Sequence, residues 1–181
     1  MRTTGYRKAM LRAAVCAAAA FSLCAATGAW AQQKQKISYK VGAENTKYPQ
    51  RHTLEVGDQP GHTLGLYEIH RAFGANAPVV NGLKLKETWT RGYSDYLDNN
   101  GLSTNYQIFV AENGDRFFVA ARTMGQADAT GKRTTVSVGE ITGGTGKFAG
   151  MKGITRAQGA SDGKRGFNET NTEIEYWFAG H

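Results

Sequence analysis

Six glycines between Gly139 and Gly153 constrain the fold of this chain more than any other stretch of its sequence. The segments on either side alternate apolar and polar residues, which is the pattern of β-strands. Glycine tolerates positive φ and allows one backbone to approach another closely, so the run predicts a tight corner between two strands. Phe148 is the single aromatic residue among these glycines, and we expect it to anchor the corner to the core.

The same run does not meet the requirements of a phosphate-binding loop. A P-loop needs glycine at position 141 and Ser or Thr at position 148, but the chain has Ile141 and Phe148 there. A dinucleotide-binding fingerprint needs its third glycine one residue before Gly150, and no helical apolar period follows. The glycines are therefore interpreted as scaffold.

The first 31 residues have the three parts of a secretory signal peptide. A basic head within residues 2–12 precedes an alanine-rich apolar body at 13–26, and Ala29-Trp30-Ala31 is a small-x-small cleavage site. A retained membrane anchor is the alternative, because the apolar stretch approaches the length of a membrane span. We predict that residues 1–31 are a signal peptide and that residues 32–181 form one domain.

Removing the signal peptide changes what the composition implies. The whole chain has a formal net charge of +7 from 22 basic and 15 acidic residues, but four of the basic residues lie in the signal peptide. The remaining 18 basic against 15 acidic residues leave +3, which removes the main argument for a nucleic-acid partner. Cys16 and Cys24 also lie in the signal peptide, so the mature chain contains no disulfide. We expect a periplasmic or secreted protein that does not associate with a membrane after cleavage.

The remainder of the chain reads as strands and turns, without a helical period. Strands are expected at about 36–42, 51–56, 62–73, 83–97, 103–111, 115–124, 132–141, 151–160 and 171–178. Turn residues at 57–61, 98–101 and 112–115 predict hairpins and therefore antiparallel neighbours. An up-and-down sheet loses its exposed edges by closing on itself, so we predict an all-β, eight-stranded antiparallel up-and-down barrel of the calycin-like kind. An immunoglobulin-like sandwich is the alternative.

The glycine-rich run also resembles a family signature. Ile141-Thr142-Gly143-Gly144-Thr145-Gly146-Lys147-Phe148-Ala149-Gly150, closed by Gly153, is similar to the ITGGTGxFAGxxG signature of allene oxide cyclase-like and dirigent-like β-barrels. The resemblance implies a barrel that binds a small, mostly apolar molecule. In characterised members of the family such barrels steer the cyclisation or coupling of reactive intermediates, so it also implies an isomerase-like or cyclase-like activity.

The strand expected at 83–97 carries the main candidate site. One of its faces presents Leu83, Leu85, Glu87, Trp89, Arg91, Tyr93, Asp95 and Leu97. If this largely apolar face looks into the barrel, three charges are buried or line a cavity, where a paired charge often marks a site. Charges four apart on a strand are about 13 Å apart, so their partners must come from adjacent strands. Candidate partners are Glu68, His70, Arg116 and Arg122. A purely structural ion-pair network is the alternative, and a bulge at Gly92 would reverse the facing beyond it.

These residues receive the following roles if the barrel acts on a ligand. The catalytic candidates are Glu87 or Glu68 as the carboxylate and Arg91 as the group that orients it; the ligand-binding candidates are Trp89, Tyr93, Asp95, His70, Phe118 and Arg122. The four histidines are too scattered to predict a metal site, and no cofactor is expected.

Three functions therefore remain open. The first is a small cyclase or isomerase acting on an apolar substrate. The second is an exported carrier that binds an apolar molecule without changing it, and the third is a structural module with a filled core. A homo-oligomer is compatible with each of them.

Overall fold

The computed structural model describes residues 33–162 and 165–178, and the predicted signal peptide lies outside the described residues. The strands are β1 (Gln35–Val41), β2 (Thr46–Glu55), β3 (His62–Ala72), β4 (Val79–Val80), β5 (Leu83–Leu97), β6 (Asn100–Ala111), β7 (Arg116–Ala127), β8 (Arg133–Gly144), β9 (Met151–Asp162) and β10 (Phe167–Phe178). Two 3₁₀ turns, η1 (Ala43–Asn45) and η2 (Gly146–Phe148), are the described helical elements. The predicted all-β class is confirmed.

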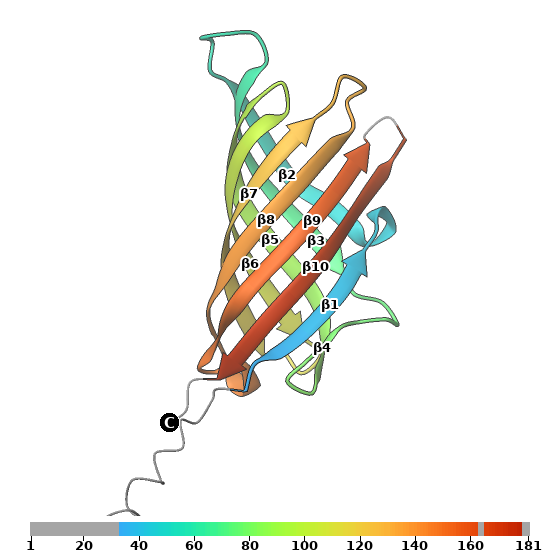
Figure 1. The fold of residues 1–181 in the computed structure, drawn as a ribbon, viewed down its shortest axis with the longest axis vertical. Coiled ribbons are helices and arrows are strands. Elements are labelled where there is room, and N and C mark those ends of the chain that lie inside the picture. The colour runs from blue at the N-terminus through green and yellow to red at the C-terminus, as the bar shows by residue number, and fades with distance from the viewer. Residues whose placement is uncertain (1–32, 163–164, 179–181) are drawn as a thin grey trace, which may run out of the picture. The chain divides into compact units, whose positions relative to one another are not determined.

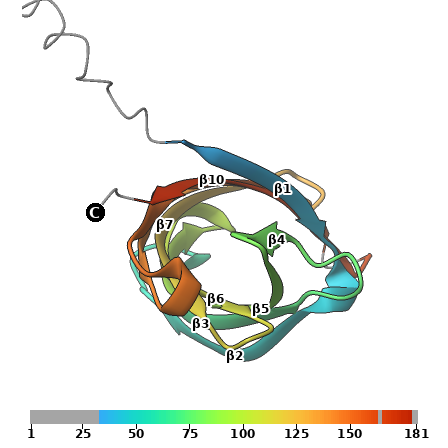
Figure 2. The ribbon, with the colours of Figure 1, turned by 90° about the horizontal axis from the view of Figure 1, so that it is seen from below.

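The strands form one antiparallel sheet in the order β1-β10-β9-β8-β7-β6-β5-β3-β2, and β4 pairs with β5. Long, inclined strands run side by side in Figure 1, and the end-on view in Figure 2 shows them curling around a central space. Most strands pair with their neighbour in the sequence, as an up-and-down topology requires.

Two details of the predicted barrel are corrected. The sheet has ten strands rather than eight, because all nine strand segments expected from the sequence form strands and the loop after β3 adds the short strand β4. The ring is also not closed by hydrogen bonds: β1 and β2 end the sheet, and no pairing joins them within the described residues. The element η1 stands between these two strands in place of a hairpin turn.

The connections divide between the two ends of the barrel. The turns after β2, β5, β7 and β9 lie at one end, which we call the hairpin end, and the glycine-rich corner lies at the other. Asp98 and Asn99 have φ of 50° and 65°, and Gly114 has φ of 88°, so the predicted turn residues adopt the left-handed conformations that such turns need.

The glycine-rich run forms the predicted corner between β8 and β9. Gly146 and Gly150 have φ of 53° and 74°, conformations that favour glycine. Phe148 is completely buried, and its ring meets Phe117 edge-on with centroids 5.3 Å apart. The prediction that Phe148 anchors the corner is confirmed.

An apolar core fills the corner end of the barrel. Its members are Val80, Leu85, Phe109, Ala111, Phe117, Val119, Ala121, Ile141, Phe148, Met151, Ile174 and Tyr176. The buried phenol of Tyr176 is satisfied, because it donates to Gln35 Oε1 and accepts from the backbone N–H of Asn81 at 2.8 Å. The apolar core therefore fills the corner end of the barrel and does not extend to the hairpin end.

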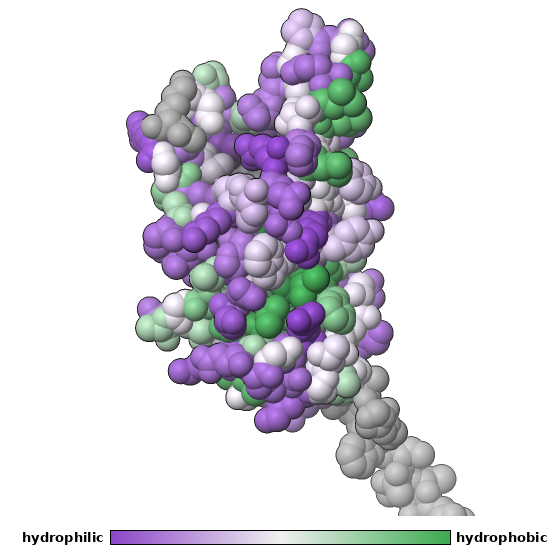
Figure 3. Space-filling view, turned by 180° about the vertical axis from the view of Figure 1, so that it is seen from behind, coloured by the Kyte–Doolittle hydropathy of each residue, from purple (hydrophilic) through white to green (hydrophobic). Residues whose placement is uncertain are grey.

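The outer surface carries large apolar side chains. Leu54, Leu66, Leu102 and Tyr106 are each more than 60% exposed. Apolar patches accordingly interrupt the polar surface in Figure 3. An apolar side chain in this sheet therefore does not by itself mark an inward position.

Candidate functional site

The barrel contains a cavity of about 450 Å³ between the apolar core and the hairpin end. Each of the nine long strands contributes residues to its wall. Asn99, Ser161 and Asn168 belong to the wall at the hairpin end, and Ile69 and Thr155 belong to it farther along the barrel. This volume falls within the range of roughly 300–1,000 Å³ that is usual for small-molecule sites.

A bulge decides which residues of β5 face this cavity. The β5–β6 register shifts between Leu85 and Glu87, so Leu85 and Thr88 both point inward. From Thr88 onward the inward positions are the small polar residues, and Thr90 and Ser94 are buried. The facing expected from the sequence is corrected here, because an extra residue in one strand exchanges its two faces.

The wall is polar, whereas the sequence analysis expected an apolar cavity. Its uncharged part consists mainly of Ser, Thr, Asn and Tyr side chains. Several of them satisfy one another across β6, β7 and β8: Gln107 Nε2 donates to Asn105 Oδ1 at 3.0 Å, Asn105 Nδ2 to Thr123 Oγ1 at 3.2 Å, and Thr123 Oγ1 to Ser137 Oγ at 2.9 Å. This side of the wall is thus internally hydrogen-bonded and preorganised.

The charged part of the wall consists of arginines. Arg51, Arg71 and Arg133 line the cavity, and no carboxylate stands among the described residues of its wall. None of these three arginines was predicted from the sequence as a site residue. The sequence signal for a polar interior is the set of small hydroxyl residues at alternate positions of β8 and β10, namely Thr135 and Ser137 on β8 and Thr170 and Thr172 on β10.

The first predicted cluster lies on the outer face of the barrel. Arg91 Nε contacts Glu68 Oε2 at 2.6 Å, and the Arg91 guanidinium lies 5.5 Å from the centre of the Trp89 ring. The side chain of Arg91 is 54% exposed. Glu68 is one of the candidate cross-strand partners that the sequence offered for the charges of β5, but neither Glu68 nor Arg91 lines the cavity.

The second predicted cluster lies beside it. His70 Nε2 is 2.9 Å from Glu87 Oε2, and the imidazole stacks on the Trp89 ring with centroids 4.2 Å apart. Burial by itself would raise the pKa of Glu87, but hydrogen bonds from His70 and Trp89 outweigh it and hold that pKa below its ordinary value. The arrangement matches the structural ion-pair network that the sequence left open, and the chemical roles of these residues stay predictions.

The remaining predicted ligand-binding residues also lie outside the cavity wall. Phe118 points away from the interior because its neighbour Phe117 occupies the core. Tyr93 is 55% exposed, and Arg122 is likewise exposed. Asp95 takes part in a separate cluster at the hairpin end.

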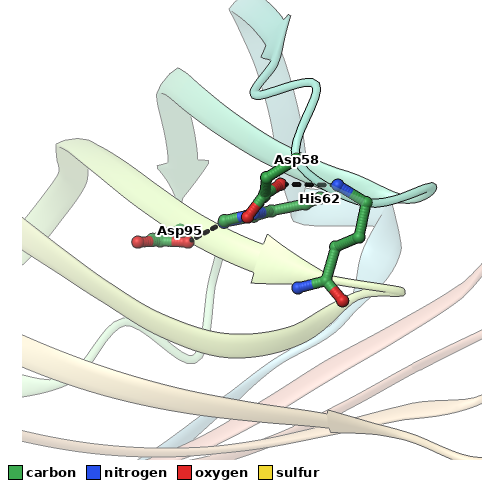
Figure 4. A network of polar contacts seen from close by, with 4 residues as sticks. Asp58, His62 and Asp95 are labelled. Atoms are coloured by element: carbon green, nitrogen blue, oxygen red, sulfur yellow. Dashed lines mark hydrogen bonds and ion pairs between the residues drawn. The ribbon is translucent and has the colours of Figure 1, made fainter.

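That cluster joins Asp95 to the β2–β3 turn through His62 (Figure 4). His62 Nδ1 is 2.6 Å from Asp58 Oδ1, and His62 Nε2 is 2.9 Å from Asp95 Oδ1. Both ring nitrogens can donate to a carboxylate only when the imidazole is protonated. The hydrogen bond to Asp95, followed by that to Asp58, raises the pKa of His62 above 6.5.

The His62 cluster should make the β2–β3 turn sensitive to pH. Because the folded-state pKa is raised, the stabilisation is fully present below pH 6.5 and is lost as the pH rises through the folded-state pKa. We expect an NMR titration of the His62 ring to have its midpoint above 6.5, and Asp95→Asn to lower that midpoint. Asp128→Asn is the control, since Asp128 bonds only within its own turn in the described contacts. An unchanged midpoint in Asp95→Asn would contradict the assignment.

No group of three or more His, Cys, Asp or Glu side chains is placed to hold a metal ion within residues 33–162 and 165–178. No helix in the described part of the chain is long and apolar enough to cross a membrane.

No protein-family model and no curated protein matches this sequence. Solved structures do match. The pterocarpan synthase dirigent protein GePTS1 superimposes with a TM-score of 0.50 at 15% identity, over 85% of this chain and 94% of that chain. The pterocarpan synthase dirigent protein PsPTS1 gives a TM-score of 0.49 at 14% identity, over 82% of this chain and 97% of that chain. The similarity to GePTS1 spans nearly all of that chain, and it confirms the resemblance that the glycine-rich run predicted. The chain therefore has the fold of the dirigent-like β-barrels.

Proposed function

We propose that this barrel binds one small organic molecule in its cavity and holds it in a single conformation. The observation that carries the proposal is the cavity of about 450 Å³, whose wall is made by all nine long strands. A wall that is internally hydrogen-bonded loses little freedom when a ligand enters, which favours binding. The polar lining favours a ligand with several polar groups rather than the mostly apolar molecule expected from the sequence.

The chemistry that such a wall supports is positioning and charge stabilisation. Guanidinium and hydroxyl groups can stabilise developing negative charge, and a fixed substrate conformation lowers the entropic part of a barrier. No carboxylate or histidine stands among the described lining residues, so the wall offers no general base of the usual kind. We propose that a reaction in this barrel is the cyclisation or isomerisation of a molecule that arrives already reactive.

A non-catalytic carrier is the second candidate. The same absence of a carboxylate and a histidine from the described lining supports it. A structural module with a filled core has less support, because the apolar core occupies only the corner end. We also propose that the protein is exported after cleavage behind Ala31. Amino-terminal sequencing of the mature protein should then begin at Gln32, and a retained Met1 would contradict export by this route.

A cavity-filling variant tests the proposed function. Ala157 lines the cavity, whereas its neighbour Gln158 is exposed, so Ala157→Phe and Gln158→Phe form a matched pair. A library of small polar aromatic compounds should contain members that raise the melting temperature of wild type and Gln158→Phe but not that of Ala157→Phe. If no compound behaves in this way, the proposal is wrong. Recovery of the bound compound unchanged would select the carrier, and its conversion would select the enzyme.

A further inference from the structure

The cavity wall has an uncompensated positive charge. Arg51, Arg71 and Arg133 line it, and none of them takes part in an ion pair with another described residue. The acidic residues whose ion pairs are described lie elsewhere and pair with other cations. Arg51 is exposed, but Arg71 and Arg133 have side-chain nitrogens buried in the wall. Buried arginine nitrogens without a carboxylate partner are unusual, because a buried charge normally has a partner.

Arg71 shows this imbalance most clearly. Its Nε is buried and has no hydrogen-bond acceptor in the part of the chain that the structure describes. Its electrostatic neighbours are the phenols of Tyr48, Tyr39 and Tyr67. Burial raises the pKa of Tyr39 to about 12 and also raises the pKa of Tyr67, so both are neutral at physiological pH. Burial lowers the pKa of Arg71, but an arginine keeps its proton in proteins. The phenols therefore do not neutralise the guanidinium.

Arg133 repeats the pattern near the hairpin end. Its Nε and Nη2 are buried without an acceptor among the described residues. The guanidinium lies 4.2 Å from the centre of the Tyr96 ring, a cation–π contact that orients it without using its N–H groups. Gly125 leaves room for it, because a Cβ at that position would lie 2.6 Å from Arg133 Nε. The fold thus holds the Arg133 guanidinium in the cavity wall with two N–H donor groups that have no acceptor among the described residues.

The guanidinium groups of Arg71 and Arg133 have a common neighbour, Tyr67. The phenol of Tyr67 interacts electrostatically with Arg133 as well as with Arg71. Its hydroxyl donates to Ser103 Oγ at 3.3 Å, which fixes the ring in the wall. Aromatic rings beside orphaned guanidinium donors are suited to a planar organic body with an acidic group.

We propose that the ligand of this cavity is a small organic acid, whose anionic group is bound by Arg71 and Arg133 and whose planar body packs against the tyrosines. The planar fork of a guanidinium matches the two oxygens of a carboxylate, and the same match holds for a sulfate or phosphate ester. This inference rests on the proposed function, since it names the chemical class of the molecule that the cavity takes.

A pair of probes that differ only in charge tests the inference. 2-Naphthoate and 2-naphthamide have nearly the same shape, and their affinities can be measured by calorimetry. We expect the wild-type protein to bind the acid about ten-fold or more tightly than the amide, because charge-assisted hydrogen bonds exceed neutral ones by this order. Arg71→Gln and Arg133→Gln should remove most of that preference while leaving amide binding nearly unchanged. Arg71→Lys should keep part of it, because it retains the charge and loses the fork.

Two controls separate this inference from the proposed function. Arg122→Gln removes an exposed arginine outside the cavity wall and should not change either affinity. Ala157→Phe should abolish binding of both probes. Equal binding of acid and amide, unaffected at Arg71 and Arg133 but abolished by Ala157→Phe, would overturn the organic-acid inference and leave the binding function intact. If neither probe binds, the inference is wrong, and the library screen on wild type and Ala157→Phe decides whether the binding function falls as well.

Discussion

Replacing Phe148 by alanine is expected to lower the free energy of unfolding by about 3–5 kcal/mol. The Phe148 ring is completely buried, meets Phe117 edge-on and fixes the glycine-rich corner between β8 and β9. Its removal leaves a cavity that the surrounding core cannot fill, because the corner backbone is held by β8 and β9. Urea denaturation followed by circular dichroism measures the change.

The matched control is Phe167→Ala at the start of β10. Phe167 is 42% exposed, so its loss should alter the unfolding free energy by no more than about 0.5 kcal/mol. A loss below about 1 kcal/mol in Phe148→Ala would show that the corner is held by its backbone alone, and the anchoring role of Phe148 would have to be abandoned.

Replacing Arg71 by methionine is expected to stabilise the ligand-free protein by about 1–3 kcal/mol, because removing a buried charge that lacks a partner recovers part of its desolvation cost. Methionine fills a similar space and adapts to irregular surroundings. The prediction follows from the orphaned Arg71 Nε and its neutral phenol neighbours, and the unfolding free energy without added ligand measures it. The same variant should bind organic acids poorly.

Arg122→Met provides the reference for this substitution. Arg122 is exposed, so exchanging it should leave the unfolding free energy within about 0.5 kcal/mol of wild type. If Arg71→Met were strongly destabilised instead, Arg71 would be a satisfied structural residue. The positive charge of the cavity wall would then no longer support binding of an anionic ligand.

Most of the fold could be predicted from local signals. The glycines around Phe148 indicated the corner, and the turn residues at Asp98 and Gly114 indicated hairpins because few other residues adopt their backbone conformations. The two corrections concern long-range features. The short strand β4 depends on a loop that meets β5, and the unpaired seam depends on where η1 directs the chain, and neither has a local signature.

The candidate site was harder to predict because the interior of this barrel is polar at the hairpin end, whereas an apolar interior is usual. The apolar face of β5 was expected to look inward, which placed Glu87, Arg91 and Asp95 in the cavity. This barrel has a polar interior at its hairpin end and apolar side chains outside, and the bulge before Glu87 exchanges the two faces. Glu68 and His70 were among the candidate partners expected on adjacent strands, and they pair with Arg91 and Glu87 because β3 and β5 are adjacent.

The missing pairing between β1 and β2 bears on how a guest molecule enters and leaves. Among the described residues, the backbone of β2 pairs only with β3, and a side-chain hydrogen bond from Asn168 Nδ2 to the Tyr48 hydroxyl at 2.6 Å joins β2 to β10. β2 is exposed along nearly all of its length. We therefore expect β2 to be the strand whose detachment from the barrel costs the least free energy. Tyr48 and Arg51 lie on β2 and line the cavity, so detachment of β2 would open the cavity at its side and move both side chains away from its wall. The residence time of a bound ligand should then depend on how often β2 detaches rather than on the width of the opening at the hairpin end.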